Sequence, residues 1–279
     1  MHDLKGARIG LLEARLTGEL AQIVRRHGGE PMNAPAVREV ETLDEGAVRA
    51  FIDGVSAGRI TVVVFLTGVG ASALFREAER LGRGAALLEG LRAATTVCRG
   101  PKPGGVLGRH DVPVSVRVPE PHTTADVLRS TAALPLAGRT IGLLHYGERN
   151  AVLADGLRAR AGAVEELCLY EWRMPIDVEP LRRLVRAAVA GELEAVAFTS
   201  QIQARHLLEV ARDVALHLDL VRALTTRVVV AAVGPTCADA LRALGMPPHV
   251  VPERPKMGPM VAALAAYLDH RAPTGSAFK

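Results

Sequence analysis

Four short turns rich in glycine and hydroxyl residues are the parts of this chain best suited to chemistry. Two of them directly follow apolar runs, at 60–67 and 195–198, and each is followed by a run with helical period. The turn residues of interest are Thr67, Gly68 and Gly70; Gly100 and Lys102; Thr199 and Ser200; and Gly234, Pro235 and Thr236. Free backbone N–H groups at the start of a helix attract anions. The sequence therefore predicts a binding site for an anionic ligand.

The cysteines and histidines give little support to a metal site or a nucleophile. Cys98, Cys168 and Cys237 are far apart and form no CxxC pair, and the nine histidines show neither HxxxH nor HExxH spacing. Each cysteine lies in an apolar stretch or at a turn, where a thiol usually serves as a small buried hydrophobe. We find no convincing catalytic dyad, and we expect no metal site.

The composition is that of a soluble globular protein. With 279 residues, 49% of them hydrophobic and 23% charged, the chain is long enough for two domains with real cores. The net charge of +4 suits a polyanionic ligand, whereas its scattered distribution and the 3% aromatic content speak against a nucleic-acid partner. No apolar run approaches the roughly 20 residues that span a bilayer, and the first residues do not resemble a signal peptide. We therefore expect no membrane partner and a cytoplasmic location.

Alternating strands and helices position the four turns. The run 60–67, ITVVVFLT, favours a strand buried on both faces, as in a parallel sheet covered by helices. Further strands are expected at 7–12, 32–37, 95–98, 112–118, 140–145, 164–170, 193–199, 227–233 and 249–251, with helices between most of them. In such α/β units the ligand binds at the carboxyl ends of the strands, where these turns lie.

An internal echo predicts that the α/β unit is duplicated. Phe65 and Phe198 are 133 positions apart, and the similar stretches ARIGLLEA and RTIGLLHY are offset by 132. The stretches CRGP and AVGP are offset by 134, and VPE occurs twice with an offset of 133. Similar offsets in the same order indicate a repeat. We expect two doubly wound parallel-sheet lobes with a ligand cleft between them.

The succession of motifs resembles the uroporphyrinogen-III synthase family. The matching stretches, in order, are IGLLEAR, VVVFLTGVGA, RGPKP, LLHYGERN, LYEWR, AFTSQIQA and AAVGPTCADALRALG. None is specific alone, but together they cover nearly the whole chain. The resemblance implies two α/β lobes joined by a two-stranded linker. It places an inserted lobe at 39–172 and a discontinuous lobe at 1–38 plus 173–279.

The resemblance also implies an activity. The family cyclises hydroxymethylbilane, a linear tetrapyrrole with eight carboxylates, to uroporphyrinogen III, with loss of water and inversion of the last ring. It needs no cofactor, and its partner is this small molecule. We expect a monomer, to which the upstream bilane-forming enzyme could hand its product.

Individual residues match the family pattern with differing strength. Tyr170 matches a tyrosine at the end of a strand that would assist departure of the hydroxyl group, although capping a sheet edge is an equally good reading. Thr199 and Ser200 match a turn that meets substrate carboxylates, and they also suit an ordinary helix cap. The other matching positions expected to bind substrate are Arg15, Thr67, Gly68, Gly70, Gly100, Lys102, Tyr146, Gly147, Gly234, Pro235 and Thr236.

For two of these positions an ordinary surface role competes: Arg15 as a solvated arginine at a helix start, and Lys102 as a surface lysine. The chain also departs from the family pattern at two places. Cys237 stands where another hydroxyl residue is common, and Glu148 puts a negative charge near the expected polyanion.

Two other functions remain open. A non-catalytic tetrapyrrole- or anion-sensing regulator would use the same lobes. A small-molecule binding protein of the periplasmic type shares the two-lobe topology, but the chain lacks both its export signal and its sequence pattern.

Overall fold

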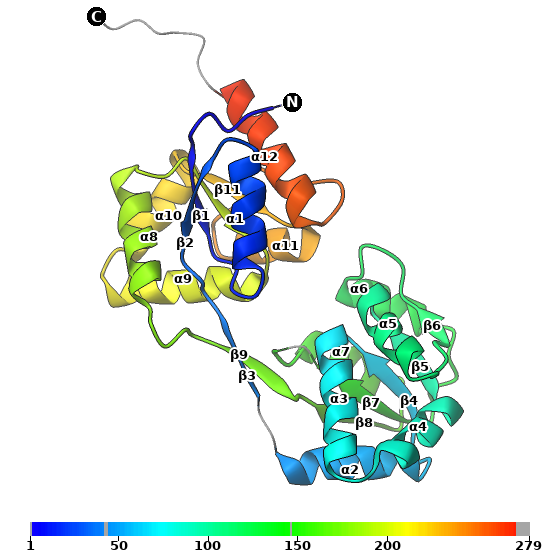
Figure 1. Cartoon of the computed structure of the whole chain (residues 1–279). Helices are drawn as coiled ribbons and strands as arrows, with labels where there is room; N and C mark the ends of the chain where they lie inside the picture. The colour runs from blue at the N-terminus through cyan, green and yellow to red at the C-terminus, as the bar shows by residue number, and fades with distance from the viewer. Residues whose placement is uncertain (1, 42–43, 146, 272–279) are drawn as a thin grey trace, which may run out of the picture. The chain divides into compact units, whose positions relative to one another are not determined.

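The computed structural model describes residues 2–41, 44–145 and 147–271. The chain divides into two compact units, one formed by Met1–Arg38 with Arg173–Lys279 and the other by Glu39–Trp172. Each unit is an α/β layer structure with helices on both faces of its parallel sheet (Figure 1). We call them unit 1 and unit 2.

Unit 1 contains a parallel sheet whose strand order is β11-β10-β1-β2, extended by a bridge from Ala231 to Val250. Its elements are β1 (Arg8–Leu11), α1 (Thr17–Arg26), β2 (Glu30–Asn33), α8 (Glu179–Ala190), β10 (Ala195–Phe198), α9 (Gln201–Asp213), α10 (His217–Thr226), β11 (Val229–Ala232), α11 (Pro235–Ala243) and α12 (Met257–Arg271). The register pairs Ile9 with Ala195.

Alternate residues of β1 face opposite helix layers. Ile9 and Leu11 are fully buried in a cluster with α1 and α12. Gly10 points the other way, and a Cβ there would lie 2.9 Å from Leu184 of α8. The small residue lets α8 pack directly on the strand, so the sheet is covered on both faces as its continuous apolar runs require.

Unit 2 contains a five-stranded parallel sheet in the order β6-β5-β4-β7-β8. Its elements are α2 (Glu45–Ser56), β4 (Ile60–Phe65), α3 (Gly68–Arg80), α4 (Gly84–Ala93), β5 (Thr95–Cys98), α5 (Pro101–Arg109), β6 (Val116–Arg117), α6 (Thr124–Ser130), β7 (Thr140–Leu144), α7 (Ala151–Arg158) and β8 (Ala163–Leu167).

The central strand β4 is buried on both faces, as its sequence predicts. Val63 and Phe65 pack in a cluster with α2, α3, α4 and α5. Val62 and Val64 pack on the opposite face with α6 and α7. The carboxyl end of β4 is thereby held between two helix layers.

A separate two-stranded antiparallel sheet pairs β3 (Arg38–Glu41) with β9 (Tyr170–Arg173). The α/β class with two parallel sheets and a two-stranded connection is confirmed. That the two ranges fold as independent domains stays a prediction.

The strands of each sequence repeat are divided between the two parallel sheets. In the first repeat β1 and β2 enter the sheet of unit 1, whereas β4, β5 and β6 enter that of unit 2. In the second repeat β7 and β8 enter unit 2, whereas β10, β11 and Val250 enter unit 1. The sheet of unit 2 therefore combines three strands of the first repeat with two of the second, and the four-stranded sheet of unit 1 combines two strands of each repeat. The repeat unit of the sequence is not the compact unit of the fold.

Several element boundaries differ from the sequence prediction. The strand expected at 164–170 is two strands, β8 and β9, separated at Cys168, and the strand expected at 112–118 is only Val116–Arg117. Helices α4, α5 and α10 were not predicted. The proline- and glycine-rich start of α5 indicated a turn, but prolines are accepted in the first turn of a helix because their missing N–H has no partner there.

Candidate functional site

The carboxyl end of β4 brings Thr67 and Tyr170 together. Thr67 is the N-cap of α3, and its hydroxyl accepts the backbone N–H of Gly70 at 3.0 Å. The phenol oxygen of Tyr170 lies 3.1 Å from the same hydroxyl. Tyr170 is 5% exposed and packs with Leu66 and Leu143 in the core. Thus a buried phenol is held at the start of a helix, where N–H groups point out of the sheet edge.

Tyr170 does not end the strand expected at 164–170; it begins β9. The strand β8 ends at Leu167, and the thiol of Cys168 hydrogen-bonds to the carbonyl oxygen of Tyr170 at 3.1 Å. The phenol is therefore fixed by the core of unit 2 at the point where the chain leaves the sheet.

The glycines at the start of α3 touch the turns that follow the two neighbouring strands. A Cβ on Gly68 would lie 3.2 Å from the backbone of Lys102, in the first turn of α5. A Cβ on Gly70 would lie 3.3 Å from the carbonyl oxygen of His145, directly after β7. The turns after β4, β5 and β7 therefore meet at one edge of the sheet, as expected for a parallel α/β sheet.

Gly100 begins α5 with a backbone conformation that favours glycine. Its φ is +93°, and a Cβ would lie 3.3 Å from the ring of His122. Pro101 and Pro103 have no N–H, so the first turn of α5 has fewer donors for an anion than the first turn of α3. Lys102 is exposed beside this turn.

The ring of Trp172 leaves no room for a side chain at position 147. The φ of Gly147 is +56°, a Cβ would lie 2.4 Å from that ring, and its carbonyl oxygen accepts the N–H of Trp172 at 2.8 Å. Gly147 is buried, so it shapes the loop after β7. Tyr146, which was expected to bind substrate, lies outside the described residues.

A buried histidine and a glutamate form a pair beside this loop that the sequence did not reveal. His145 is fully buried; its Nε2 lies 2.6 Å from Oε2 of Glu166. The N–H of Asn150 donates to its Nδ1 at 3.2 Å, so the ring proton is on Nε2 and is donated to the carboxylate. Arg158 also pairs with Glu166, and Arg149 lies 3.7 Å from it.

Burial and charge set the protonation of this pair. Burial lowers the pKa of His145 below 6.5, although the bond to Glu166 opposes the shift. Burial would raise the pKa of Glu166, but the hydrogen bond and charge of its partners hold that pKa below 4.5. The pair is a neutral imidazole against a carboxylate. The imidazole accepts the N–H of Asn150 at the end of the loop and donates to Glu166, which also pairs with Arg158.

In unit 1 the turn after β10 is hydrogen-bonded to the carboxylate of Glu13. The hydroxyl of Thr199 donates to Oε2 of Glu13, and Gln203 donates to the same hydroxyl at 2.8 Å. The other oxygen of Glu13 accepts the N–H groups of Arg15 and Leu16 at 3.1 and 3.2 Å. Glu13 thus binds part of the donor set that was expected to meet substrate carboxylates.

Ser200 is the N-cap of α9, and its backbone N–H donates to Oε1 of Gln203 at 3.2 Å. The capping role of this turn is therefore present. The role of Thr199 and Ser200 in ligand binding stays a prediction, and so does that of Arg15, whose side chain is exposed.

The turn after β11 has the same construction as the turn after β5. Gly234 precedes α11 and packs closely, since a Cβ would lie 2.7 Å from Pro255; Pro235 opens the helix and Thr236 is exposed. The thiol of Cys237 is buried and donates to the carbonyl oxygen of Phe198 at 3.6 Å, and burial raises its pKa to about 12. This thiol is a packing group that faces the core.

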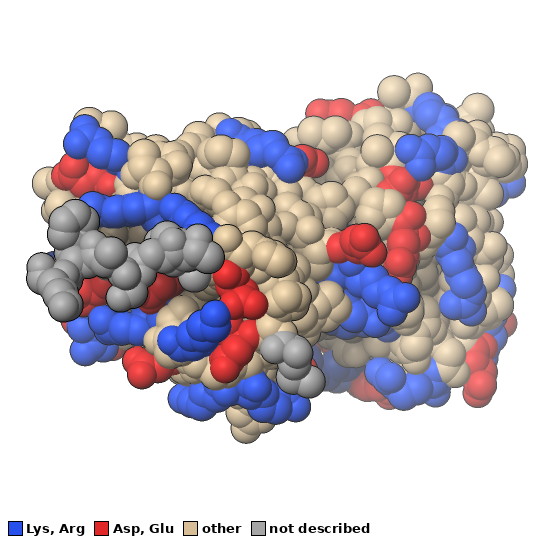
Figure 2. Space-filling model, turned by 90° about the horizontal axis from the view of Figure 1, so that it is seen from above, with Lys and Arg blue, Asp and Glu red and all other residues tan. Residues whose placement is uncertain are grey.

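Charges of both signs are interspersed on the face drawn in Figure 2, and no continuous basic surface covers it. Within the described residues no group of three His, Cys, Asp or Glu side chains is placed to hold a metal ion. No helix in the described ranges is long and apolar enough to span a membrane.

Sequence reasoning missed Glu13 and the pair His145–Glu166. Glu13 had a usable signal, because it lies two residues beyond β1, at the carboxyl edge. Glu166 had none: it lies within a strand, and only the pairing of β8 with β7 brings it beside His145.

Comparisons with known proteins agree with this architecture. The family model described as "Uroporphyrinogen-III synthase HemD" matches residues 18–262. A Bacillus subtilis protein named "Uncharacterized protein YjjA" is 29% identical over 96% of this chain and 98% of its own length.

Two solved structures are similar over most of the chain. A mutant uroporphyrinogen III synthase from the extremely thermophilic bacterium Thermus thermophilus is 28% identical with a TM-score of 0.77, covering 95% of this chain and all of that one. A uroporphyrinogen-III synthetase from Helicobacter pylori is 14% identical with a TM-score of 0.54, covering 94% and 99%, and supports the fold alone.

Proposed function

The chain belongs to the uroporphyrinogen-III synthase family, and from that premise we propose that it is itself such a synthase. It would cyclise hydroxymethylbilane to uroporphyrinogen III with loss of water and inversion of the last pyrrole ring. This makes it a lyase of tetrapyrrole biosynthesis whose partner is a small linear tetrapyrrole. The observation that carries the proposal is the buried phenol of Tyr170 beside Thr67 at the start of α3.

The substrate's eight carboxylates need donors, and each unit has helix N-termini at the carboxyl edge of its own sheet. In unit 2 the N-terminus of α3 follows Thr67, and Lys102 is exposed beside the next turn. In unit 1 the N-termini of α9 and α11 follow Ser200 and Gly234. Helix N-termini stabilise negative charge without bringing a mobile counter-ion.

Tyr170 would assist departure of the hydroxyl group. As a neutral phenol it can donate a hydrogen bond to the leaving oxygen without adding a charge among the eight carboxylates. The carbon–oxygen bond breaks, and the oxygen leaves as water after taking a proton. The pyrrole that carried the hydroxymethyl group becomes a cationic azafulvene. Thr67 holds the phenol in place at 3.1 Å.

The remaining steps need positioning more than proton transfer. The substituted α-carbon of the last ring attacks the azafulvene carbon, which gives a spiro intermediate. The original bond from that α-carbon to the methylene of the preceding ring then breaks and leaves the cation on that methylene carbon. The free α-carbon of the last ring bonds to this carbon, so the ring is inverted, and loss of a proton restores the aromatic pyrrole. Holding the chain folded so that the uninverted closure is excluded would be the main contribution of the protein.

A complementation experiment tests this proposal. We expect the chain to restore growth to a bacterial strain that lacks its own uroporphyrinogen-III synthase and depends on haem. The matched control is the Tyr170→Phe variant expressed at the same level, which should restore growth less well. Absence of rescue by a soluble, folded wild-type protein would contradict the proposal.

A non-catalytic tetrapyrrole-binding regulator is the second candidate, and Glu13 is the observation that favours it. Its carboxylate lies among the donors of the Thr199 turn, where a substrate carboxylate would otherwise bind. A regulator would bind the tetrapyrrole but would fail to rescue the deficient strain.

A further inference from the structure

Each unit has a pocket at the amino end of its parallel strands, opposite the edge that carries the proposed site. The pocket of unit 1 has a volume of about 480 Å³ and includes Ala7, Glu194 and Arg227, which precede β1, β10 and β11. The pocket of unit 2 has a volume of about 390 Å³ and lies at the starts of β4, β5 and β7. By the internal repeat these are equivalent places, so the two pockets can be compared directly.

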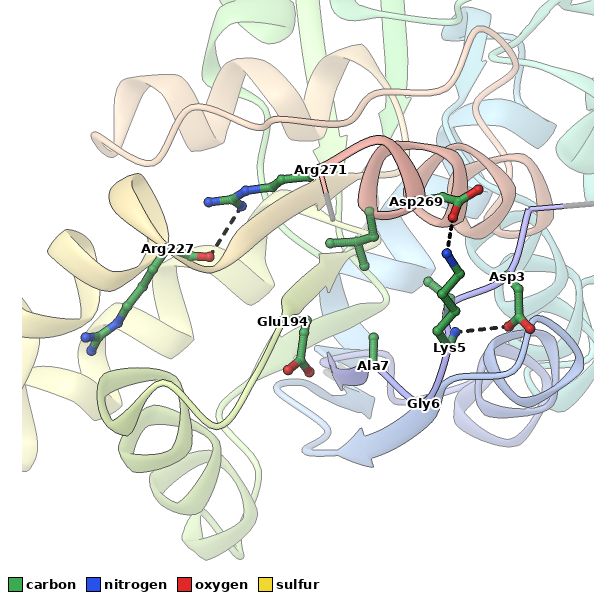
Figure 3. A pocket seen from close by; sticks show the side chains of 10 residues that line it. Asp3, Lys5, Gly6, Ala7, Glu194, Arg227, Asp269 and Arg271 are labelled. Carbon is green, nitrogen blue, oxygen red and sulfur yellow. Dashed lines mark hydrogen bonds and ion pairs between the residues drawn. The ribbon is translucent and has the colours of Figure 1, made fainter. Parts of the chain in front are cut away.

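Polar groups that line the pocket of unit 1 have partners within the protein, and Figure 3 shows Lys5 paired with Asp269. The pocket contains three acidic and three basic residues: Asp3, Glu194 and Asp269 against Lys5, Arg227 and Arg271. Lys5 Nζ lies 2.5 Å from Asp269 Oδ1, and the Glu194 carboxylate accepts the N–H of Arg8 at 2.6 Å. Arg271 donates to the carbonyl oxygen of Arg227 at 3.4 Å. Because these groups already have partners, a ligand could form few additional hydrogen bonds or ion pairs with them.

The pocket of unit 2 differs in charge and in hydrogen bonding. Arg59, Arg139 and three threonines at 61, 95 and 140 line it, together with Ala93 and Gly138, and no acidic side chain among the described residues does. Arg59 pairs with Glu165 outside this lining. For the Arg139 guanidinium and for the hydroxyls of the threonines at 95 and 140, the described part of the chain provides no hydrogen-bond or ion-pair partner.

Thr61 strengthens the case because its hydroxyl is buried without a partner. Its Oγ1 is inaccessible to solvent and makes no hydrogen bond within the described ranges. The register between β4 and β7 shifts at this residue: Ile60 pairs with Thr140 and Val62 with Ile141, so Thr61 has no partner in the ladder. An unpaired buried hydroxyl is costly, and bulges often occur beside binding sites.

We propose that this pocket binds a tetrahedral inorganic oxyanion of the phosphate type. A guanidinium and several hydroxyls can donate to three or four oxygens of one such anion at the same time. A carboxylate has only two oxygens and would leave some of these donors unpaired. The site belongs to the opposite end of the sheet from Thr67 and Tyr170, and it does not depend on the proposed synthase activity.

Calorimetric titration of the full chain with inorganic phosphate at constant ionic strength tests the proposal. We expect one saturable site with a Kd on the order of 1 mM or tighter. Arg139→Met keeps the aliphatic stem and removes the charge, and should weaken binding about tenfold or more. Thr140→Val keeps the shape and removes a hydroxyl that lines the pocket, and should also weaken binding. Arg227→Met, in the equivalent pocket of unit 1, is the matched control and should leave the Kd unchanged.

Competition and mapping complete the experiment. Sulfate should displace phosphate, whereas acetate at the same ionic strength should not; equal competition by acetate would overturn the assignment to a tetrahedral anion. Amide NMR shifts should gather at residues 59–61, 95 and 139–140. No saturable binding, shifts confined to the carboxyl edge of the sheet, or unchanged binding in a folded Arg139→Met variant would overturn the site itself.

Discussion

At the scale of single residues, side chains that match the same family motifs have different surroundings in the structure. Tyr170 and Thr67 share a hydrogen bond at the start of α3. Cys237 faces the core, and Gly147 is needed by the ring of Trp172. A match to a family motif therefore has different meanings at different positions, and only the contacts distinguish them.

The first prediction concerns Tyr170. Tyr170→Phe keeps the buried ring and removes one hydrogen bond, so the free energy of unfolding should fall by only about 1 kcal/mol. Turnover of hydroxymethylbilane should fall roughly 10- to 100-fold, because general-acid assistance is lost while positioning remains. Steady-state kinetics with chemical denaturation of the same samples would measure both.

Thr67→Ser is the control for this experiment, because it keeps the oxygen that caps α3 and contacts the phenol. It should retain most of the activity. Wild-type turnover in Tyr170→Phe would remove the phenol from the mechanism.

The second prediction concerns His145 and pH. Because burial holds its pKa below 6.5, the unfolded chain binds this proton more readily than the folded one. The stability that the neutral imidazole contributes is present above pH 6.5 and is lost as the pH falls below it. We expect the free energy of unfolding to decrease from pH 7.5 to 5.5, by at most about 1.4 kcal/mol per pH unit from this group.

The measurement compares wild type with His145→Gln over that range, which stays above the titration of Glu166. Because all other histidines are common to both proteins, the difference between the two curves reports on His145. A variant that loses stability as steeply as wild type would show that this imidazole does not contribute.

At the scale of secondary-structure elements, the glycines of the candidate site act through close packing and special backbone angles. Gly68 and Gly70 let the start of α3 approach the turns after β5 and β7. Gly100 and Gly147 have φ values of +93° and +56°. These residues allow three turns to meet at one sheet edge, so their substitution should disturb the fold before it disturbs the chemistry.

The third prediction uses Gly147. An alanine there would combine a left-handed backbone with a contact of 2.4 Å to Trp172. We expect Gly147→Ala to lower the free energy of unfolding by about 2–4 kcal/mol. Thermal or chemical denaturation checks this.

Gly108 of α5 offers the opposite case, because a Cβ there would meet nothing within 4 Å. Gly108→Ala should raise stability by up to about 1 kcal/mol through helix propensity. If both variants behaved alike, the packing assigned to Gly147 would be wrong.

At the scale of the whole molecule, the exchange of strands between repeats is the main organisational feature. The sheet of unit 2 is complete within Glu39–Trp172, whereas the first sequence repeat contains three of its strands and two of the other sheet. The inserted unit therefore contains a complete sheet and core, although the strands of each sequence repeat are divided between the two sheets.

The fourth prediction follows from this arrangement. A fragment of residues 39–172 should fold and unfold cooperatively, because all strands of its sheet and both helix layers lie within it. The equally long fragment 1–134 should not, because it lacks β7 and β8 for one sheet and β10 and β11 for the other. Circular dichroism during denaturation distinguishes them, and an unfolded 39–172 fragment would contradict the prediction.

Much of the fold was predictable because buried parallel strands are continuous apolar runs. The strand ITVVVF and its helix-capping Thr67 follow from periodicity and turn chemistry, and both the family resemblance and the fold class are confirmed. Helix α5 was missed because its proline-rich start resembles a turn. Sequence offsets reveal repeats but not which sheet each strand joins, so the lobe bounds 39–172 and 1–38 plus 173–279 came from the family resemblance and not from the offsets.

The candidate site was less predictable, for a physical reason. Local patterns locate helix starts, whereas contacts between distant strands decide what those starts face. Glu166 reaches His145 only through the register of β8 with β7, and Glu13 reaches Thr199 across 186 positions. The roles of the matched residues in binding stay predictions.

The proposed activity is tested most directly by the isomer ratio of the product. Purified protein is incubated with hydroxymethylbilane, and the reaction is stopped early. The oxidised porphyrins are then separated into type III, the product with the inverted ring, and type I, the product of uninverted closure. We expect type III to dominate, at a rate proportional to protein concentration. Type I alone, formed as fast as in buffer without protein, would contradict it.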